Sequence, residues 1–212
     1  MNTRTIIFDL DGTLTDPKVG ITRCIQYALE NMQLAVPDTT DLLWCIGPPL
    51  QESFAQLAGS DRVDEAIKLY RRRFSTIGLF ENTPYSGIHD ALDAISHVSH
   101  QLMVASSKPK VFVDKILERF GLTQYFTHVY GAELDGTRSD KTALLQFALS
   151  ASQITAKNAI MIGDRKHDII GAKNNGLASI GVLYGYGSSD ELLHAGAQEL
   201  AESPAHLVQL LS

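Results

Sequence analysis

Four aspartates stand just after stretches of sequence that are typical of buried strands. Asp9 and Asp11 follow one apolar run, and Asp164 and Asp168 follow another. A carboxylate at a strand tip can act as a nucleophile, and a second one beside it can protonate a leaving oxygen and then activate water. Crowded carboxylates repel one another, and Mg²⁺ prefers such oxygen ligands together with a substrate phosphate. These residue types and places therefore indicate metal-assisted chemistry at a phosphate group.

A hydroxyl and an ammonium group stand in comparable places. Ser106 follows a further apolar run and could donate a hydrogen bond to a phosphoryl oxygen, although it could also cap a helix that begins near Pro109. Lys141 falls in the first turn of a predicted helix, where a cation is unfavourable. Neutralising charge between a nucleophile and a phosphate explains that placement better than exposure to solvent does. The candidate catalytic residues are therefore Asp9, Asp11, Ser106 and Lys141.

The turn after Asp11 suits a phosphoryl group. Gly12 lets the backbone turn tightly and leaves room beside it, and Thr13 could satisfy amides of the turn. Polar turns after buried strands often contain Asp and Gly, so this motif gains its meaning from the other strand ends. Asp168 could hold or support a metal, or it could simply stabilise the start of a helix. The candidate metal ligands are Asp9, Asp11, Asp164 and Asp168.

Apolar runs and helical patterns alternate along most of the chain. Four runs, each followed by a polar residue or a turn signal, predict strands at Thr5–Phe8, Leu102–Ala105, Ala159–Ile162 and Ala178–Leu183, and a weaker run lies at Thr127–Tyr130. Helical spacing follows at Pro109–Phe120, Asp140–Ala151 and Ile169–Asn175. This order predicts an α/β fold with a doubly wound, Rossmann-like parallel sheet. Ligands bind beyond the carboxyl ends of such strands, where the candidate residues would meet.

Residues 16–84 interrupt the alternation, because they show helical periodicity and no convincing strand. One apolar stripe consists of Val19, Ile25, Ala28, Leu29 and Met32, and another of Val63, Ala66, Ile67, Tyr70 and Phe74. About 70 residues are too many for one crossover helix. We therefore expect a helical cap domain at 16–84, inserted after the first strand of a core made by 1–15 and 85–212. It could close over the site as a lid or pack beside the sheet without moving. Trp44 is expected in its core.

Composition excludes several classes of protein. The net charge of −6 over 212 residues argues against a nucleic-acid partner. Two cysteines, Cys24 and Cys45, exclude a disulfide scaffold and a four-thiolate zinc site, and are expected to be buried. No apolar stretch approaches the roughly 20 residues of a membrane helix, and no signal peptide is evident. We expect a cytoplasmic monomer or weak homodimer whose partner is a small phosphorylated metabolite.

The motifs resemble those of the haloacid dehalogenase-like superfamily. Asp9-Leu-Asp-Gly-Thr-Leu14, Ser106, Lys141 and Gly163-Asp-Arg-Lys-His-Asp168 match its four motifs in order, and the insertion resembles its helical C1-type cap. Ser107-Lys108-Pro109 and Gly181-Val-Leu-Tyr-Gly-Tyr-Gly187 resemble the phosphoglycolate phosphatase-like branch.

The resemblance implies a phosphatase that uses Mg²⁺. Asp9 would form an aspartyl-phosphate, Asp11 would be the acid and base, and Ser106 and Lys141 would hold the phosphoryl group. Mg²⁺ would sit on Asp9, Asp164 and the backbone carbonyl of Asp11, with Asp168 nearby. Because a halide leaves without a proton and an alkoxide does not, an aspartate at position 11 favours phosphate esters. The implied substrate-binding residues are Gly12, Thr13, Ser107 and Lys108.

The insertion is expected to choose the substrate, and phosphoglycolate is the first candidate, with nucleotides, sugar phosphates and pyrophosphate also open. Pro48 lies in a stiff turn that could face the site. Arg71 belongs to three successive arginines that fan over about 200° of a helix, so a solvated face is the simpler interpretation. Glu133–Thr137 nearly repeats the first motif, but we expect it to be a loop rather than a second site.

Two other functions share these motifs. A sugar phosphomutase needs the same acid and base, and would return the phosphoryl group to a sugar. A non-enzymatic receiver-like module also has an acidic Mg²⁺ pocket, a hydroxyl and a lysine, but it lacks a large insertion after the first strand and spaces its aspartates differently.

Overall fold

The computed structural model describes residues 4–98 and 101–212, so residues 1–3 of the expected core segment lie outside it. The chain divides into two compact units, one made of 1–16 and 84–212 and the other of 17–83. These limits differ by one residue at each junction from the expected ones. Two short strands flank the junctions, β2 (Thr15–Asp16) and β3 (Thr83–Pro84), and they pair with each other.

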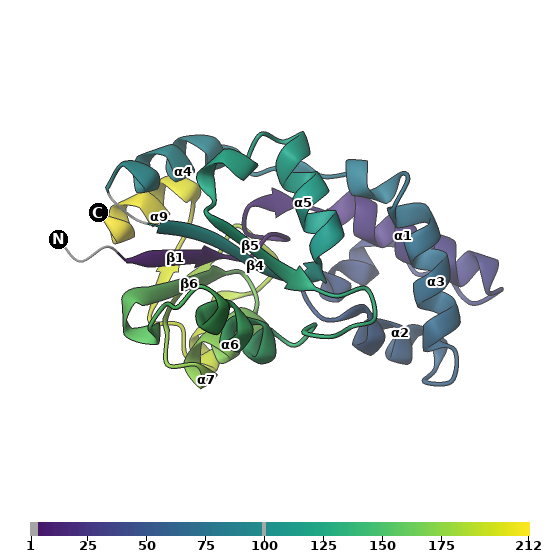
Figure 1. The fold of residues 1–212 in the computed structure, drawn as a ribbon. Coiled ribbons are helices and arrows are strands. Elements are labelled where there is room, and N and C mark those ends of the chain that lie inside the picture. Colours follow the sequence, from purple (N-terminus) through teal and green to yellow (C-terminus); the bar gives the residue numbers. More distant parts are fainter. Residues whose placement is uncertain (1–3, 99–100) are drawn as a thin grey trace. The chain divides into compact units, whose positions relative to one another are not determined.

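The larger unit is built on a six-stranded sheet in the order β5-β4-β1-β6-β7-β8, in which every neighbouring pair is parallel (Figure 1). Its strands are β1 (Thr5–Phe8), β4 (Gln101–Pro109), β5 (His128–Ala132), β6 (Ala159–Gly163), β7 (Ala178–Val182) and β8 (Glu199–Ala201). The predicted doubly wound α/β fold is confirmed. The sequence did not predict β8, because three residues with one exposed glutamate give no apolar run.

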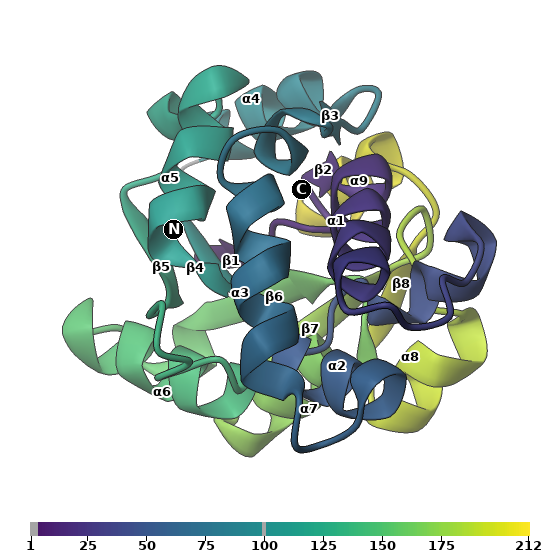
Figure 2. The ribbon, with the colours of Figure 1, turned by 90° about the vertical axis from the view of Figure 1, so that its right-hand side faces the viewer.

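Helices cover both faces of this sheet. They are α4 (Ile88–His97), α5 (Lys110–Arg119), α6 (Lys141–Ala151), α7 (Lys166–Asn174), α8 (Ser189–Ala195) and α9 (Pro204–Leu211). Helices α4, α5 and α9 lie on one face, and α6, α7 and α8 lie on the other (Figures 1 and 2). The Asp140 side chain caps α6 by accepting a hydrogen bond of 2.9 Å from the amide of Ala143.

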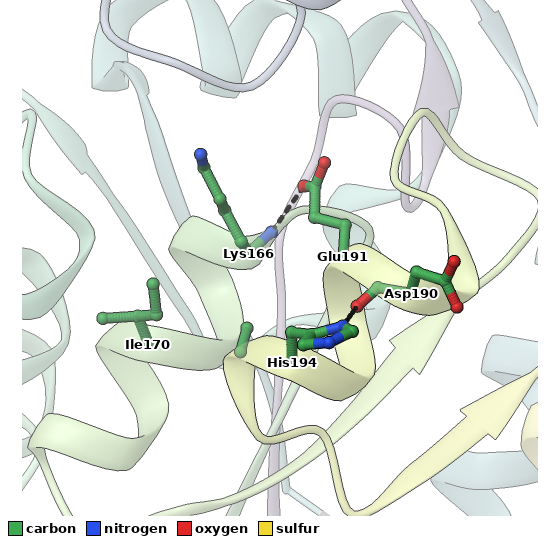
Figure 3. A pocket seen from close by; sticks show the side chains of 6 residues that line it. Lys166, Ile170, Asp190, Glu191 and His194 are labelled. Atoms are coloured by element: carbon green, nitrogen blue, oxygen red, sulfur yellow. Dashed lines mark hydrogen bonds between the residues drawn. The ribbon is translucent and has the colours of Figure 1, made fainter.

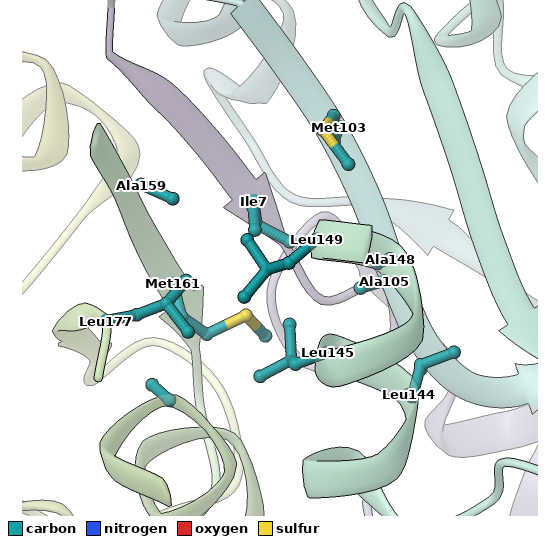
Figure 4. Close-up of a cluster of buried hydrophobic side chains, with 11 residues drawn as sticks. Ile7, Met103, Ala105, Leu144, Leu145, Ala148, Leu149, Ala159, Met161 and Leu177 are labelled. Atoms are coloured by element: carbon teal, nitrogen blue, oxygen red, sulfur yellow. The ribbon is translucent and has the colours of Figure 1, made fainter. Parts of the chain in front are cut away.

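The core between the sheet and α6 is almost entirely aliphatic (Figure 4). Leu144, Leu145 and Ala148 of α6 pack on Ile7 of β1 and Met161 of β6, and all five side chains are fully buried. Burial of this size contributes about 1.5–3 kcal/mol for each large side chain. The strand ends that carry the polar residues are therefore held by a rigid layer.

The smaller unit is helical, with α1 (Lys18–Asn31), α2 (Leu50–Ala58) and α3 (Val63–Phe74), and two 3₁₀ helices, η1 (Thr39–Cys45) and η2 (Gly78–Phe80). Helix α3 packs against both α1 and α2. Cys24 and Cys45 are buried, as expected. None of the helices in the described part of the chain is long and apolar enough to cross a membrane.

Two predicted core residues of this unit are exposed instead. Val19 is 41% exposed, because it lies about 160° around α1 from Ile21, on the face opposite the buried stripe. Trp44 is 37% exposed. It lies in η1, where Leu42 and Cys45 share the buried face because residues three apart eclipse in a 3₁₀ helix.

Candidate active site

Asp9 extends from the tip of β1 and meets Lys141 from the first turn of α6. The Asp9 amide donates a hydrogen bond of 2.9 Å to the Ile162 carbonyl, which continues the pairing of β1 with β6 beyond its last residue. The Lys141 ammonium lies 2.9 Å from Asp9 Oδ1, 2.7 Å from Asp168 Oδ1 and 2.9 Å from the Ala105 carbonyl oxygen. Its three protons therefore have three oxygen partners.

Burial and helix position both disfavour a charge on Lys141, yet the two carboxylates outweigh them. The side chain is 4% exposed and stands at the positive end of α6. Burial alone would lower the pKa of Lys141, but Asp168 and Asp9 together raise it above its usual value. The ammonium is thus fixed in its charged form beside Asp9, as a charge-neutralising group must be.

Three carboxylates form one buried cluster next to this lysine. Asp9, Asp164 and Asp168 each offer an oxygen, and these oxygens lie within 4.8 Å of one another. Asp168, in the first turn of α7, also accepts a hydrogen bond of 3.1 Å from the Arg165 amide. Asp168 therefore stabilises the start of α7 and also belongs to the acidic cluster, and its role in holding a metal stays a prediction.

Among the three carboxylates of the cluster, the negative charge of Asp164 is the least compensated by its surroundings. It is completely buried, its Oδ2 accepts a hydrogen bond of 2.8 Å from the Tyr186 amide, and its Oδ1 has no hydrogen-bond partner among the described residues. Burial raises the pKa of Asp164 well above its usual value, and Asp168 and Asp9 raise it further. Burial also raises the pKa of Asp168 to about 6, against the opposing charge of Lys141.

A divalent cation fits this donor set. Three buried carboxylates face one lysine, and none of the residues that the structure describes donates a hydrogen bond to the buried Asp164 Oδ1. Leaving such groups uncompensated costs several kcal/mol. Hard oxygen donors match Mg²⁺, which usually takes one or two carboxylates together with waters and a phosphate, so two of these three carboxylates would suffice as ligands.

Asp11 lies apart from the acidic cluster, because its carboxylate is held by Lys108. The Lys108 ammonium is 2.8 Å from Asp11 Oδ1 and 2.7 Å from Oδ2. Burial raises the pKa of Asp11, although Lys108 opposes this shift. The sequence placed Lys108 near a substrate but did not predict this pair, because a link across 97 residues leaves no local pattern. Only the backbone carbonyl of Asp11 stays as its predicted metal ligand.

The turn after Asp11 is as tight as predicted, but Thr13 does not close it. Gly12 has φ of +82°, and a Cβ there would lie 2.1 Å from Asp164 Oδ2. The Thr13 hydroxyl is buried without a hydrogen-bond partner among the described residues, so the expectation that it satisfies turn amides is wrong. The amides of Leu14 and Thr15 instead donate to the Leu10 carbonyl, at 2.9 and 3.0 Å.

Ser106 and Ser107 lie within β4, which runs four residues further than the sequence predicted. Ser106 is buried, and its hydroxyl accepts a hydrogen bond of 3.4 Å from the Lys108 amide. It does not cap α5, whose N-cap is Pro109. The alternative role as a helix cap is therefore wrong, and its role as a phosphate donor stays a prediction.

Pro48 and Arg71 belong to the smaller unit, and their part in a substrate site stays a prediction. Pro48 precedes α2 and is half-buried. Arg71 of α3 is also half-buried, whereas Arg72 is exposed and Arg73 pairs with Glu81 at 2.7 Å. The three arginines therefore diverge as their helical spacing predicts.

Two other places that could be mistaken for a site lack its chemistry. In the near-repeat of the first motif, Glu133 and Asp135 are exposed in a loop after β5, and Glu133 pairs with Arg138. A hollow of about 460 Å³ lies between α7 and α8 (Figure 3). Its Glu191 is occupied, because it accepts hydrogen bonds from Arg165 Nε and the Lys166 amide, each at 2.9 Å.

The loop after β7 contributes to the site in a way that the sequence did not predict. A Cβ on Gly185 would lie 2.3 Å from the Gly12 carbonyl oxygen, and one on Gly187 would lie 2.0 Å from the Asp164 carbonyl oxygen. In the sequence, the alternation of tyrosine and glycine at 184–187 carries only a resemblance to the phosphoglycolate phosphatase-like branch. Its physical meaning is that the loop backbone presses against the first motif and Asp164.

Comparisons with known proteins agree with this geometry. A family model for haloacid dehalogenase-like hydrolases matches residues 6–182. A 5′-nucleotidase from Pseudomonas aeruginosa is 48% identical over 189 residues, which cover 88% of this chain and 86% of that protein. The crystal structure of a predicted phosphatase from Clostridium acetobutylicum has a TM-score of 0.96 and 41% identity, covering 100% of this chain and 99% of that one. A phosphoglycolate phosphatase from Vibrio parahaemolyticus is 26% identical, covering 98% of this chain and 95% of that protein.

Proposed function

This chain belongs to the haloacid dehalogenase-like hydrolases, and on that premise we propose that it is a Mg²⁺-dependent phosphatase of small phosphate monoesters. The observation that carries the proposal is the position of Asp9. Its carboxylate is held by Lys141 on one side and lies beside Asp164 and Asp168, which could hold a cation. A nucleophile, a fixed positive charge and a metal site thus occur together.

Asp9 performs the first chemical step. One of its carboxylate oxygens attacks phosphorus, a bond forms between them, and the bond from phosphorus to the ester oxygen breaks. Lys141 neutralises charge that builds on Asp9 and the phosphoryl oxygens, and Ser106 donates a hydrogen bond to one of these oxygens. The bound Mg²⁺ contributes charge neutralisation and orientation of the phosphate. In-line transfer needs positioning and neutralisation above all.

Asp11 handles the protons of both steps. It gives its proton to the leaving ester oxygen, and afterwards takes a proton from the water that hydrolyses the aspartyl-phosphate and frees Asp9. Burial favours the protonated form of Asp11 by raising its pKa, whereas the adjacent Lys108 opposes it. A phosphate group that draws Lys108 towards itself would remove this opposition, and would raise the pKa of Asp11 when an acid is needed.

Among phosphate monoesters, nucleoside 5′-monophosphates are the class that we favour. The support is the 48% identity to a protein named 5′-nucleotidase, against 26% to the phosphoglycolate phosphatase. Phosphoglycolate, the first candidate from the motifs, is kept as the second. We assign the choice between them to residues 17–83, which are inserted where a cap would be.

Phosphate release from a panel of esters tests this function. The panel contains nucleoside 5′-monophosphates, 2-phosphoglycolate, sugar phosphates and pyrophosphate, each with Mg²⁺ and with EDTA, for the wild type and Asp9→Asn. We expect Mg²⁺-dependent release that the variant loses, with nucleotides ranked first. A rearranged sugar phosphate without free phosphate would replace the proposal by a mutase. Stable autophosphorylation without turnover would replace it by a receiver-like module, and release by the variant would remove Asp9 as the nucleophile.

A further inference from the structure

The loop Tyr184–Gly187 after β7 joins two parts of the core that are far apart in sequence. Its two glycines allow the backbone to lie against Gly12 and Asp164, where a Cβ would not fit. The two tyrosines alternate with these glycines along the loop. The loop backbone is therefore held close to Gly12 and Asp164, and the tyrosines make further contacts.

Tyr186 makes two hydrogen bonds that link Asp164 to the end of β2. Its amide donates to Asp164 Oδ2 at 2.8 Å, and its phenol donates to Asp16 Oδ1. Asp16 is the last residue of the first core segment, directly before residues 17–83. Burial raises the pKa of Tyr186, and Asp16 raises it further, so this phenol stays a donor at any ordinary pH.

The neighbouring Tyr184 lies in the same loop without such a link. Its ring packs edge-to-face on Tyr85, with ring centroids 5.0 Å apart and an interplanar angle of 67°. Its hydroxyl is buried and has no hydrogen-bond partner among the described residues. Of the two phenols, that of Tyr186 anchors the loop by a hydrogen bond and that of Tyr184 does not. Removing each hydroxyl in turn therefore tests the effect of the anchor.

We propose that Tyr186 is a positioning residue for the metal site, which acts by fixing the carboxylate of Asp164. Anchored by its phenol on Asp16, the residue holds its amide against Asp164 Oδ2, so that the unpartnered Oδ1 stays available to a cation. The proposal rests on the proposed function in one respect, that Asp9, Asp164 and Asp168 bind Mg²⁺. It adds that the affinity of this site depends on a residue that would not touch the ion.

Mg²⁺ binding measured by titration calorimetry without substrate tests the proposal on the whole chain. Loss of a partner that orients a metal ligand typically costs 10–100-fold in affinity. Tyr186→Phe keeps the amide and loses only its anchor, so we expect a smaller loss, about 3–10-fold. Tyr184→Phe is the matched control, because it removes from the same loop a hydroxyl that makes no hydrogen bond to any described residue. The Mg²⁺ affinity of this variant should stay within about twofold of the wild type.

Variants of Asp16 separate positioning from general loosening. Asp16→Asn keeps an oxygen that can accept from the Tyr186 phenol and should retain the wild-type affinity. Asp16→Ala removes the acceptor and should weaken Mg²⁺ binding as much as Tyr186→Phe does. Combined with Tyr186→Phe, it should add no further loss, because both changes remove the same link. Amide hydrogen exchange of residue 186 in the metal-free protein should be faster in Tyr186→Phe and in Asp16→Ala than in the wild type.

The outcomes are decisive in each direction. Unchanged Mg²⁺ affinity in Tyr186→Phe, or an equal loss in Tyr184→Phe, overturns the proposal. If the wild type binds Mg²⁺ and responds to these changes but releases no phosphate from any ester, the proposed reaction fails and the positioning role stands. If the wild type binds no Mg²⁺, both fail.

Discussion

The ammonium of Lys141 donates a hydrogen bond of 2.9 Å to Asp9 Oδ1, although 132 residues separate the two in the sequence. The same ammonium contacts Asp168 and the carbonyl oxygen of Ala105. One lysine therefore ties together the end of β1, the middle of β4 and the start of α7. Two carboxylates offset the cost of burying this cation, and Asp9, the proposed nucleophile, gains a fixed counter-charge.

Asp9→Asn should abolish turnover and leave the fold intact. The amide retains the shape of the side chain and an oxygen for Lys141, but it is a poor nucleophile. Lys141 also keeps its other two partners, so the melting temperature should change little. Asp135→Asn is the matched control, because it changes the exposed aspartate of the near-repeat and should retain full activity. Turnover near the wild-type rate in Asp9→Asn would show that another group attacks phosphorus.

Asp11→Asn should impair hydrolysis according to the leaving group. An alkoxide must be protonated as it departs, whereas an activated aryl oxide leaves without help. We therefore expect a loss of about 10²–10⁴-fold in kcat/KM for an alkyl phosphate and a much smaller loss for an aryl phosphate in the transfer step. Burst kinetics with the aryl ester would isolate that step from the water attack. Equal losses with both esters would exclude Asp11 as the acid.

Local patterns in the sequence predicted the strand tips, and the fold then brought them together. The apolar runs before Asp9 and Asp164 are local patterns, so these carboxylates could be placed in advance at strand ends on one edge of the sheet. That their two strands are neighbours is shown only by the structure. Lys108 could not be paired with Asp11 in the same way, because their contact depends on β4 continuing past Ser106. The prediction for Val19 is wrong because its helical spacing places it about 160° from Ile21. The prediction for Trp44 is wrong because its exposure depends on a 3₁₀ helix, in which Leu42 and Cys45 share the buried face.

Two contacts show what the sequence could not predict about the site: the predicted hydrogen bonds of Thr13 are not made to the described residues, and the hydrogen bond of the Tyr186 amide was not predicted. The sequence predicts that the Thr13 hydroxyl accepts hydrogen bonds from amides of the turn. In the structure, the amides of Leu14 and Thr15 donate to the Leu10 carbonyl instead. The Tyr186 amide, which carries no sequence signal because every residue except proline has one, holds Asp164. Backbone groups are the part of a site that residue types cannot reveal.

Asp164→Asn should raise the stability of the metal-free protein and remove its response to Mg²⁺. The carboxylate is completely buried beside two others, and its neutral amide would relieve their repulsion. The amide is also a weak ligand, so Mg²⁺ should no longer raise the melting temperature. Thermal melts of the wild type and the variant with EDTA and with Mg²⁺ would measure both effects. A variant that Mg²⁺ stabilises as much as the wild type would exclude Asp164 as a ligand.

Mg²⁺ binding should weaken as the pH falls through about 6, and binding near that pH should release protons. Burial raises the pKa of Asp168 from 3.8 to about 6, and raises that of Asp164 well above its usual value. A carboxyl group must lose its proton to bind the ion, so apparent affinity falls once these groups are protonated. Calorimetry in buffers of different ionisation enthalpy at pH 6 counts the protons released.

The carboxyl groups of Asp164 and Asp168 should make the metal-free protein less stable as the pH rises, whereas an aspartate in an ordinary salt bridge makes a protein more stable. Because the folded state binds their protons more tightly than the unfolded state does, their contribution to stability is fully present below the usual aspartate pKa of 3.8. The contribution of Asp168 is lost as the pH rises through about 6, and that of Asp164 is also lost as the pH rises. The metal-free melting temperature should therefore be higher at pH 5.5 than at pH 7.5, and Mg²⁺ should stabilise most at pH 7.5. In Asp164→Asn, both the metal-free melting temperature and the stabilisation by Mg²⁺ should depend less on pH. A metal-free melting temperature that rises from pH 5.5 to pH 7.5, with no proton release on Mg²⁺ binding, would contradict this prediction. It would mean that the carboxylates are already ionised at pH 5.5 and that repulsion among them does not destabilise the fold.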